Sequence, residues 1–323
     1  MKIINYIKGF VHAGRIYMYD LKNDLKYTLL SHNAEDDQEM LLSSLVVAAH
    51  TIEKGLTMPK KRYPFGEAKA MEILSGCQRY VECGYNLTES RFKDVLGIMI
   101  EYQHVNKTWG GVINSKIDSY IDHLRSVMPE VASKCQKYSI NRDVYFSHTN
   151  DDFVAFSSSR NSCRNLPGHV SDDSLKRALE LSMTAPSTCN RQSHRIHLLQ
   201  SDESKKIILS LQSGNRGFGD LADQFILITS DLRCWPSKHQ RNAPYVDGGI
   251  YLMNLLYCLH YERIAACTLN MYLDAIRTQR LHNELNIPGY EVPIALVAIG
   301  IPPETFDLAN SHRRVYEEIT FAH

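Results

Sequence analysis

Two short polar stretches carry the side chains in this sequence that are best suited to bind a small anionic ligand. The first reads Ser159-Arg160-Asn161-Ser162-Cys163-Arg164, and the second reads Ala185-Pro186-Ser187-Thr188-Cys189-Asn190-Arg191-Gln192. The first offers two guanidinium groups, which suit phosphate, beside short hydroxyl and amide groups. The second is a polar loop, begun by a proline, between two apolar segments. Together they predict a site for a flat, anionic ligand that makes hydrogen bonds.

Flavin mononucleotide (FMN) is one ligand with these features, because it has a dianionic phosphate, a chain of hydroxyls and a polar ring edge. The matching groups belong to Arg160, Ser162, Arg164, Asn190 and Gln192. Arg313 and Arg314, near the C-terminus, could complete a phosphate clamp, or they could form a solvated pair in the tail. The spacing alone fits a sugar-phosphate or nucleotide site equally well.

Other chemistry-bearing patterns are weaker. Gly214-x-x-Gly217-x-Gly219 precedes a strand and lacks the spacing of the dinucleotide fingerprint, and the sequence has no Walker-type Gly-Lys-Ser/Thr loop. Cys163 and Cys189 lack a patterned base that would activate a thiol nucleophile. His50 and Glu53 share a helix face, as a metal or acid–base pair would, although a polar cluster at a helix end explains them better.

Composition narrows the class of protein. The chain has 323 residues, 44% of them hydrophobic, with 36 basic and 36 acidic residues, which is typical of a globular protein and argues against nucleic-acid binding. No Cys-x-x-Cys pair suggests a zinc ribbon, and reduced thiols are expected. The N-terminus lacks the features of a signal peptide, and no apolar run approaches a membrane span. These observations predict a cytoplasmic protein without a metal site.

The elements that must position the site differ between the two halves. The first half is predicted to be mostly helical, with helices over 38–56 (Gly55 as its C-cap), 66–83, 88–105 and 114–128. We therefore predict a helical domain or extension over residues 1–150 and a second domain over residues 151–323.

In the second half, helical and strand periods alternate. The predicted helices cover 175–184, 203–212, 247–260 and 275–286, and the predicted strands cover 195–199, 222–229, 264–270 and 293–300. This order is typical of a sheet between helices. The first polar stretch precedes these elements, and the second lies between the first predicted helix and the first strand.

Residues from about 153 to 320 resemble the nitroreductase-like family of FMN-dependent oxidoreductases. The first stretch resembles that family's opening Ser-Arg-Arg/His-Ser-x-Arg/Lys motif, and the second resembles its Ala-Pro-Ser-x-x-Asn-x-Gln-Pro-Trp loop. Further similar pieces are Asp247-Gly248-Gly249 with Asn254-Leu255-Leu256, then Ala266-Cys267-Thr268-Leu269-Asn270, Gly300-Ile301-Pro302, and Arg313-Arg314-Val315-Tyr316-Glu317-Glu318.

The resemblance implies an α+β fold with a mixed sheet flanked by helices, a long central helix, and a homodimer with FMN at its interface. It implies that FMN is bound by Arg160, Asn161, Ser162, Arg164, Pro186, Ser187, Asn190, Gln192, Leu269, Asn270 and Arg313. The second stretch would in many relatives reach the FMN of the partner subunit. The flavin carries the chemistry, so the resemblance implies no catalytic side chain.

The activity implied is a two-step transfer of hydride or electrons from NADH or NADPH, through FMN, to a small-molecule acceptor. Two alternatives remain open. One is a specialised biosynthetic flavin dehydrogenase, because the His50-x-x-Glu53 segment resembles that of extended family members associated with polysaccharides. The other is a non-catalytic flavin-binding or scaffold protein. The sequence departs from the family pattern at Asn161, at Ser193-His194 and at Ser311, and in its helical first half. These departures put generic nitroaromatic reduction in doubt.

Overall fold

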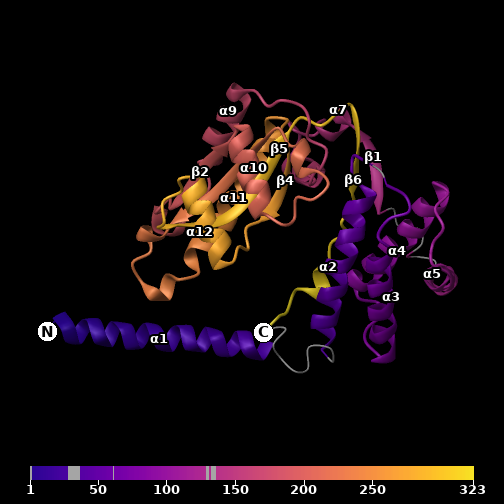
Figure 1. Cartoon of the computed structure of the whole chain (residues 1–323), viewed down its shortest axis with the longest axis horizontal. Helices are drawn as coiled ribbons and strands as arrows, with labels where there is room; N and C mark the ends of the chain where they lie inside the picture. The colour runs from indigo at the N-terminus through magenta and orange to yellow at the C-terminus, as the bar shows by residue number, and fades with distance from the viewer. Residues whose placement is uncertain (1, 28–36, 61, 129–130, 132–135) are drawn as a thin grey trace. The chain divides into compact units, whose positions relative to one another are not determined.

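The computed structural model describes residues 2–27, 37–60, 62–128, 131 and 136–323 (Figure 1). By compactness the chain forms two units. The first comprises Met1–Tyr138 and Ala309–His323, and the second comprises Ser139–Leu308. The second unit is thus inserted into the first along the sequence. The division into domains at residue 150 stays a prediction.

The first unit is helical. Its helices are α1 (Lys2–Tyr27), α2 (Gln38–Leu56), α3 (Glu67–Glu82), α4 (Ser90–Thr108) and α5 (Ser115–Val127), and its C-terminal segment holds a 3₁₀ turn, η5 (Tyr316–Glu318). The four predicted helices correspond to α2–α5. Gly66 begins α3 with a φ of 72°, and the Asn114 side chain caps α5. The predicted C-cap at Gly55 is wrong, because α2 runs through it and ends at Leu56.

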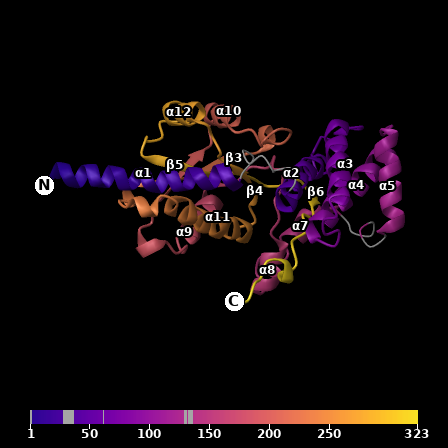
Figure 2. The ribbon, with the colours of Figure 1, turned by 90° about the horizontal axis from the view of Figure 1, so that it is seen from below.

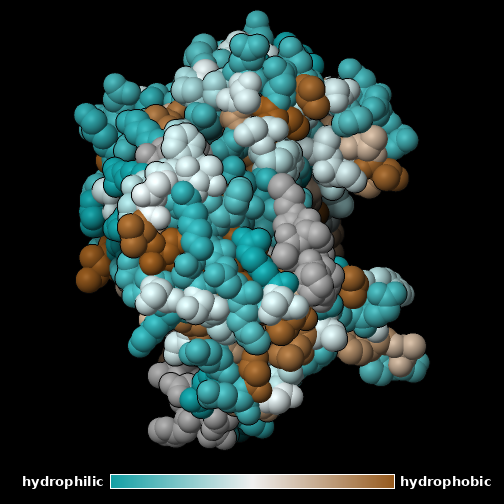
Figure 3. Space-filling model, turned by 90° about the vertical axis from the view of Figure 1, so that its right-hand side faces the viewer, coloured by the Kyte–Doolittle hydropathy of each residue, from teal (hydrophilic) through white to brown (hydrophobic). Residues whose placement is uncertain are grey.

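The core of this unit lies between α2, α3, α4 and α5, whose apolar faces provide most of its fully buried side chains. Tyr80 stacks on Phe92 with ring centroids 4.2 Å apart, which joins α3 to α4. Figure 3 shows the outer face over α3–α5, where hydrophobic residues are scattered among hydrophilic ones. This packing makes the first half a folded unit with its own core.

The C-terminal segment completes this helical unit. The Ser311 amide and hydroxyl donate hydrogen bonds of 3.1 and 2.9 Å to Glu53 Oε1, and His50 Nδ1 lies 2.9 Å from Glu53 Oε2. Glu53 is only 3% exposed. Further along the segment, Glu318 accepts a 2.8 Å bond from the Ser90 amide at the start of α4. The structure therefore explains His50 and Glu53 as an anchor for the tail. Across the described residues, no group of three or more His, Cys, Asp or Glu could hold a metal ion.

The second unit contains the sheet. Its helices are α7 (Arg142–Tyr145), α8 (Phe153–Ser159), α9 (Asp172–Ser182), α10 (Asp202–Leu211), α11 (Ala243–Tyr261) and α12 (Ala275–Glu284). Its main strands are β2 (His194–Leu199), β3 (Gln224–Asp231), β4 (Ala265–Asn270) and β5 (Glu291–Gly300), and β1 (Lys137–Asn141) pairs with β6 (Thr305–Ala309) in a separate two-stranded sheet. All the predicted helices and strands are present, whereas β1, β6, α7 and α8 were not predicted.

The strand order in the larger sheet is β2-β3-β5-β4, and all three pairings are antiparallel. Figure 2 shows this sheet between one helical layer with α9 and α11 and another with α10 and α12. α11 is the long central helix expected, and it crosses β5 closely: a Cβ at Gly248 would lie 2.8 Å from Ile294. The fold is α+β, and the mixed character expected of the sheet is confined to one parallel bridge between Ser162 and Ala266.

A buried histidine at the end of α11 holds the end of α8. His260 is 1% exposed, and its Nε2 lies 2.8 Å from Ser159 Oγ. Because the Ser159 hydroxyl donates to the Phe156 carbonyl, Nε2 must carry the proton and donate to Oγ. Tyr145, Phe146 and Phe156 surround the imidazole ring. Burial, and then the nearby charge of Arg160, lower the His260 pKa to about 4.

Replacing Glu53 with Gln should destabilise the helical unit, because the buried carboxylate accepts charge-assisted bonds from Ser311 and His50. We expect a loss of about 1–3 kcal/mol in the free energy of unfolding and faster proteolysis of the C-terminal segment. His50→Ala removes only one partner and should cost less. A Glu53→Gln protein as stable as the wild type would contradict this role.

The His260 pKa, which folding lowers, should make stability fall as the pH drops. In the unfolded chain the imidazole takes up a proton near pH 6.5, whereas in the folded chain it stays neutral down to about pH 4. The stability that depends on a neutral His260 is therefore fully present above pH 6.5, and it is lost as the pH falls towards 4. Urea unfolding at pH 7 and pH 5 should show a smaller loss for His260→Gln than for the wild type. The pKa of His194 is also lowered by burial, so His194 should account for part of the stability loss that His260→Gln still shows.

Candidate functional site

The first polar stretch lies along the outer edge of β4. The Cys163 amide donates a 3.0 Å bond to the Ala266 carbonyl, and Ser162 forms a parallel bridge with Ala266. Further on, Gly168 exchanges two backbone bonds with Ile301, just after β5. The approach is close at Gly300, where a Cβ would lie 2.2 Å from the Leu166 carbonyl oxygen. The backbone therefore fixes the stretch against the sheet.

Arg164 and Thr268 each lie two residues beyond the bridge between Ser162 and Ala266. Arg164 is only 7% exposed, and its Nε is buried without a hydrogen-bond partner. The buried Oγ1 of Thr268 also lacks a partner. A buried polar atom without a hydrogen-bond partner is costly, so both atoms are suited to bind a polar, anionic ligand.

The rest of the first stretch lies at the end of α8. Arg160 caps that helix and is half-buried, and its Nε is also buried without a partner. The Asn161 side chain turns back to donate to the Ser159 carbonyl at 3.2 Å, and the Asn161 carbonyl accepts a 2.8 Å bond from the Tyr145 hydroxyl. Ser162 is exposed. At this departure from the family pattern, the amide thus binds its own backbone.

The second polar stretch is a strained loop held by one carboxylate. Asp247 on α11, which is 4% exposed, accepts bonds from the Thr188 amide at 2.9 Å and the Thr188 hydroxyl at 2.7 Å. Cys189, Asn190 and Gln192 have φ values of 53°, 54° and 48°, in the left-handed region. Each such residue costs roughly 1–2 kcal/mol, less for Asn. Asp247 therefore stabilises a backbone shape that these residues would not adopt alone.

The polar groups of this loop are accessible. Pro186, Asn190 and Gln192 are exposed, and Gln192 Nε2 donates to Asn190 Oδ1 at 2.9 Å. The Ser187 hydroxyl, half-buried, accepts a 3.0 Å bond from the Gln192 amide. Arg191 lies over the Trp235 ring at 5.0 Å, and its buried Nη1 has no partner. The two amide side chains can exchange their mutual bond for bonds to a ligand.

The remaining predicted residues fall in two places. Leu269 is buried and Asn270 is exposed at the end of β4, next to the first stretch, and the Asn270 carbonyl accepts a bond from Gln212 at 3.2 Å. Arg313 belongs to the other compact unit, where its exposed side chain donates to the Ser311 carbonyl. Sequence reasoning missed Thr268, Arg191 and the loop-holding role of Asp247. The only sequence signal was that each sits within or beside a motif.

The two stretches lie at opposite edges of the sheet. The first pairs with β4, and the second leads into β2, which is the other outer strand of the order β2-β3-β5-β4. Three strand spacings separate these edges, about 14 Å. Among the described residues, no hydrogen bond or ion pair joins the two stretches. In a single chain the predicted binding residues therefore fall into separate groups.

Neither cysteine of the two stretches has the surroundings of a nucleophile. Cys163 is fully buried, and burial raises its pKa to about 12, so the thiol stays protonated. Cys189 is exposed, and among the described residues no histidine or carboxylate forms a hydrogen bond with its thiol. The structure thus favours ligand binding by the cationic and amide groups over thiol chemistry.

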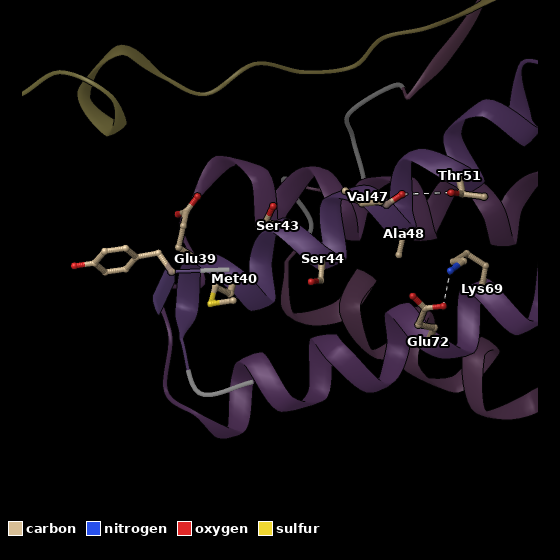
Figure 4. Close-up of a pocket in the computed structure, with 10 residues that line it drawn as sticks. Glu39, Met40, Ser43, Ser44, Val47, Ala48, Thr51, Lys69 and Glu72 are labelled. Carbon is tan, nitrogen blue, oxygen red and sulfur yellow. Dashed lines mark hydrogen bonds and ion pairs between the residues drawn. The ribbon is translucent and has the colours of Figure 1, made fainter. Parts of the chain in front are cut away.

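A cavity in the helical unit lacks such unpaired groups. It measures about 580 Å³ and lies over α2 and α3 (Figure 4). Its charged residues have partners in the protein: Lys69 pairs with Glu72 at 2.5 Å, and Glu39 accepts two bonds from Arg91. The Thr51 hydroxyl donates to the Val47 carbonyl. Because these charges are already neutralised, the cavity is poorly suited to a dianionic ligand.

The sequence profile of the Nitroreductase family matches residues 158–301. An FMN-dependent nitroreductase from Clostridium difficile R20291 shares 18% identity and a TM-score of 0.44, over 53% of this chain and 99% of that one. A nitroreductase family protein from Clostridium difficile 630 shares 20% identity and a TM-score of 0.44, over 53% and 97%.

A protein from Exiguobacterium sibiricum 255-15, solved in complex with FMN, shares 18% identity and a TM-score of 0.46, over 53% and 97%. Comparison with curated proteins gave no match. The matched residues include the whole of both polar stretches, the sheet β2-β3-β5-β4 and the central helix. Residues 158–301 of the chain thus match the Nitroreductase family, and an N-terminal helical region accompanies them.

Proposed function

We propose that the protein is an FMN-dependent oxidoreductase that takes electrons from NADH or NADPH and passes them to a small-molecule acceptor. The observation that carries this proposal is the buried Nε of Arg164, which has no hydrogen-bond partner and lies inside the segment that matches the Nitroreductase family. A folded protein rarely leaves such an atom without a partner. An anionic group bound beside β4 would provide the missing partner.

The donor set fits FMN. Arg160 and Arg164 can pair with the phosphate or with an anionic ring edge, and the Thr268 hydroxyl can bond the ribityl chain. Asn190 and Gln192 offer amide groups of the kind that a ring edge requires. Bound FMN would supply the redox chemistry, and the side chains would supply binding, orientation and positive charge.

The separation of the two stretches supports a homodimer. Since they lie at opposite edges of one sheet, a complete site would combine the first stretch of one chain with the second stretch of another. A two-fold axis would then generate two equal sites. This arrangement requires no rearrangement of the sheet, only the apposition of β4 and β2 edges from different chains. The molar mass in solution, measured by light scattering, tests it, and a monomer that holds FMN would contradict it.

The direct test of the function is the absorbance spectrum of the purified protein, followed by anaerobic titration with each nicotinamide. We expect a bound flavin whose absorbance bleaches with NADH or NADPH and recovers when an acceptor is added. Protein that stays colourless after incubation with FMN would refute the cofactor. Bound flavin that neither nicotinamide bleaches would refute the electron donor while leaving the cofactor intact.

Replacing Arg164 with Gln should weaken FMN binding without destabilising the fold. We expect FMN affinity to fall at least about 30-fold, because a charge-assisted interaction is lost. The free energy of unfolding of the flavin-free protein should stay the same or rise, since a buried unpaired charge is removed. Fluorescence titration with FMN and urea unfolding measure the two effects. Arg177→Gln, an exposed arginine paired with Glu262, is the matched control and should change neither.

Replacing Asp247 with Ala should loosen the second stretch. The Thr188 amide and hydroxyl lose their acceptor, and the left-handed residues that follow lose their main constraint. We expect FMN affinity to fall roughly 5- to 30-fold, with the sheet intact by circular dichroism. Asp220→Asn, at an exposed acid of the same unit, is the control. Unchanged affinity in Asp247→Ala would show that this loop does not contact the flavin.

A further inference from the structure

Helix α1 presents an apolar face to solvent. Its exposed side chains include Phe10 (74%), Tyr17 (57%), Met18 (55%), Leu21 (49%) and Leu25 (47%). With Val11 they repeat at three- and four-residue intervals and span an arc of about 120° on a helix of 3.6 residues per turn. The same period in the sequence includes Ile3, Ile4 and Ile7. An apolar face of this size calls for a partner surface.

Basic residues border that face on one side. Arg15, Lys22 and Lys26 are spaced by seven and four residues, so they project along one line of the helix, next to Val11 and Met18. The whole helix contains five basic residues, Lys2 and Lys8 among them, and two acidic ones, Asp20 and Asp24. The acidic pair lies on the opposite border. Long basic side chains at the edge of an apolar face can reach phosphate groups while their stems stay in apolar contact.

The pattern distinguishes a lipid surface from a second helix. A two-stranded coiled coil uses a narrow seam at two positions in seven, whereas this face is wider and includes Gly14 at its centre. Charged residues are spread along the helix, and no helix in the described ranges combines the length and apolarity needed to cross a membrane. Helices with a wide apolar face and basic borders lie in the plane of anionic bilayers.

We propose that α1 binds to the surface of an anionic membrane, with the Phe10–Leu25 face among the acyl chains and Arg15, Lys22 and Lys26 on the lipid phosphates. Gly9 and Gly14 weaken the helix in water by about 1 kcal/mol each, so contact with lipid also stabilises the helix. The inference rests on α1 alone and holds whether or not the protein binds FMN.

The test uses the full-length protein and vesicles of phosphatidylcholine with or without phosphatidylglycerol, separated by sedimentation. We expect at least tenfold stronger partition onto the anionic vesicles, weakened by salt. The variant Arg15→Glu with Lys22→Glu should lose roughly 30-fold, and Phe10→Ser with Leu21→Ser roughly tenfold or more. Gly14→Ala should bind several-fold more tightly, because the added methyl group meets no neighbour within 4 Å and favours the helix.

Val112→Ser is the matched control, because Val112 is 86% exposed in the connection between α4 and α5; it should partition like the wild type. Equal partition onto neutral vesicles would overturn the electrostatic part of the proposal. Absence of binding to both kinds of vesicle would overturn the proposal as a whole. Self-association that Phe10→Ser abolishes, without vesicle binding, would identify a second copy of the chain as the partner instead.

Discussion

The backbone bond from Cys163 to Ala266 fixes the segment that carries Arg164 against the edge of the sheet. It brings an irregular segment against an edge strand and thereby turns Arg164 into a nearly buried group. Without that pairing Arg164 would be a solvated surface residue, and its Nε could form hydrogen bonds with water. The burial of Arg164 thus depends on main-chain geometry, and the close contact at Gly300 leaves no room for a side chain.

The second stretch depends on a different kind of constraint. Its shape is costly in itself, since Cys189 and Gln192 occupy a backbone region that favours glycine. The carboxylate of Asp247 offsets that cost from a neighbouring helix, and Gly248, the next residue, lets the same helix approach β5 closely. Helix packing and loop geometry are therefore coupled through two adjacent residues. Strain of this sort is commonly found where a protein binds a ligand.

Much of this arrangement could be read from the sequence, and the reasons for the exceptions are physical. Asn114 marks a helix start because its side chain caps the helix locally, and the long apolar runs of β3 and β5 predict buried strands. β1 and β6 were missed because each is short and finds its partner far along the chain. The unpartnered atoms Arg164 Nε and Thr268 Oγ1 are buried by contacts between distant parts of the chain, which no local pattern encodes. The motif residues themselves were found by resemblance, and their roles toward a ligand remain proposals.

The anchoring of Ser311 on Glu53 has a consequence for the order of folding. The helical unit is discontinuous in the chain, because its last residues follow the whole sheet-containing unit. During synthesis, therefore, the carboxylate of Glu53 leaves the ribosome long before the hydroxyl and amide that complete its bonds. A nascent chain can assemble α2–α4 early, but the Glu53 carboxylate lacks these partners until Ser311 has been synthesised. Removal of the segment that contains Ser311 would thus destabilise α2, the helix that carries Glu53.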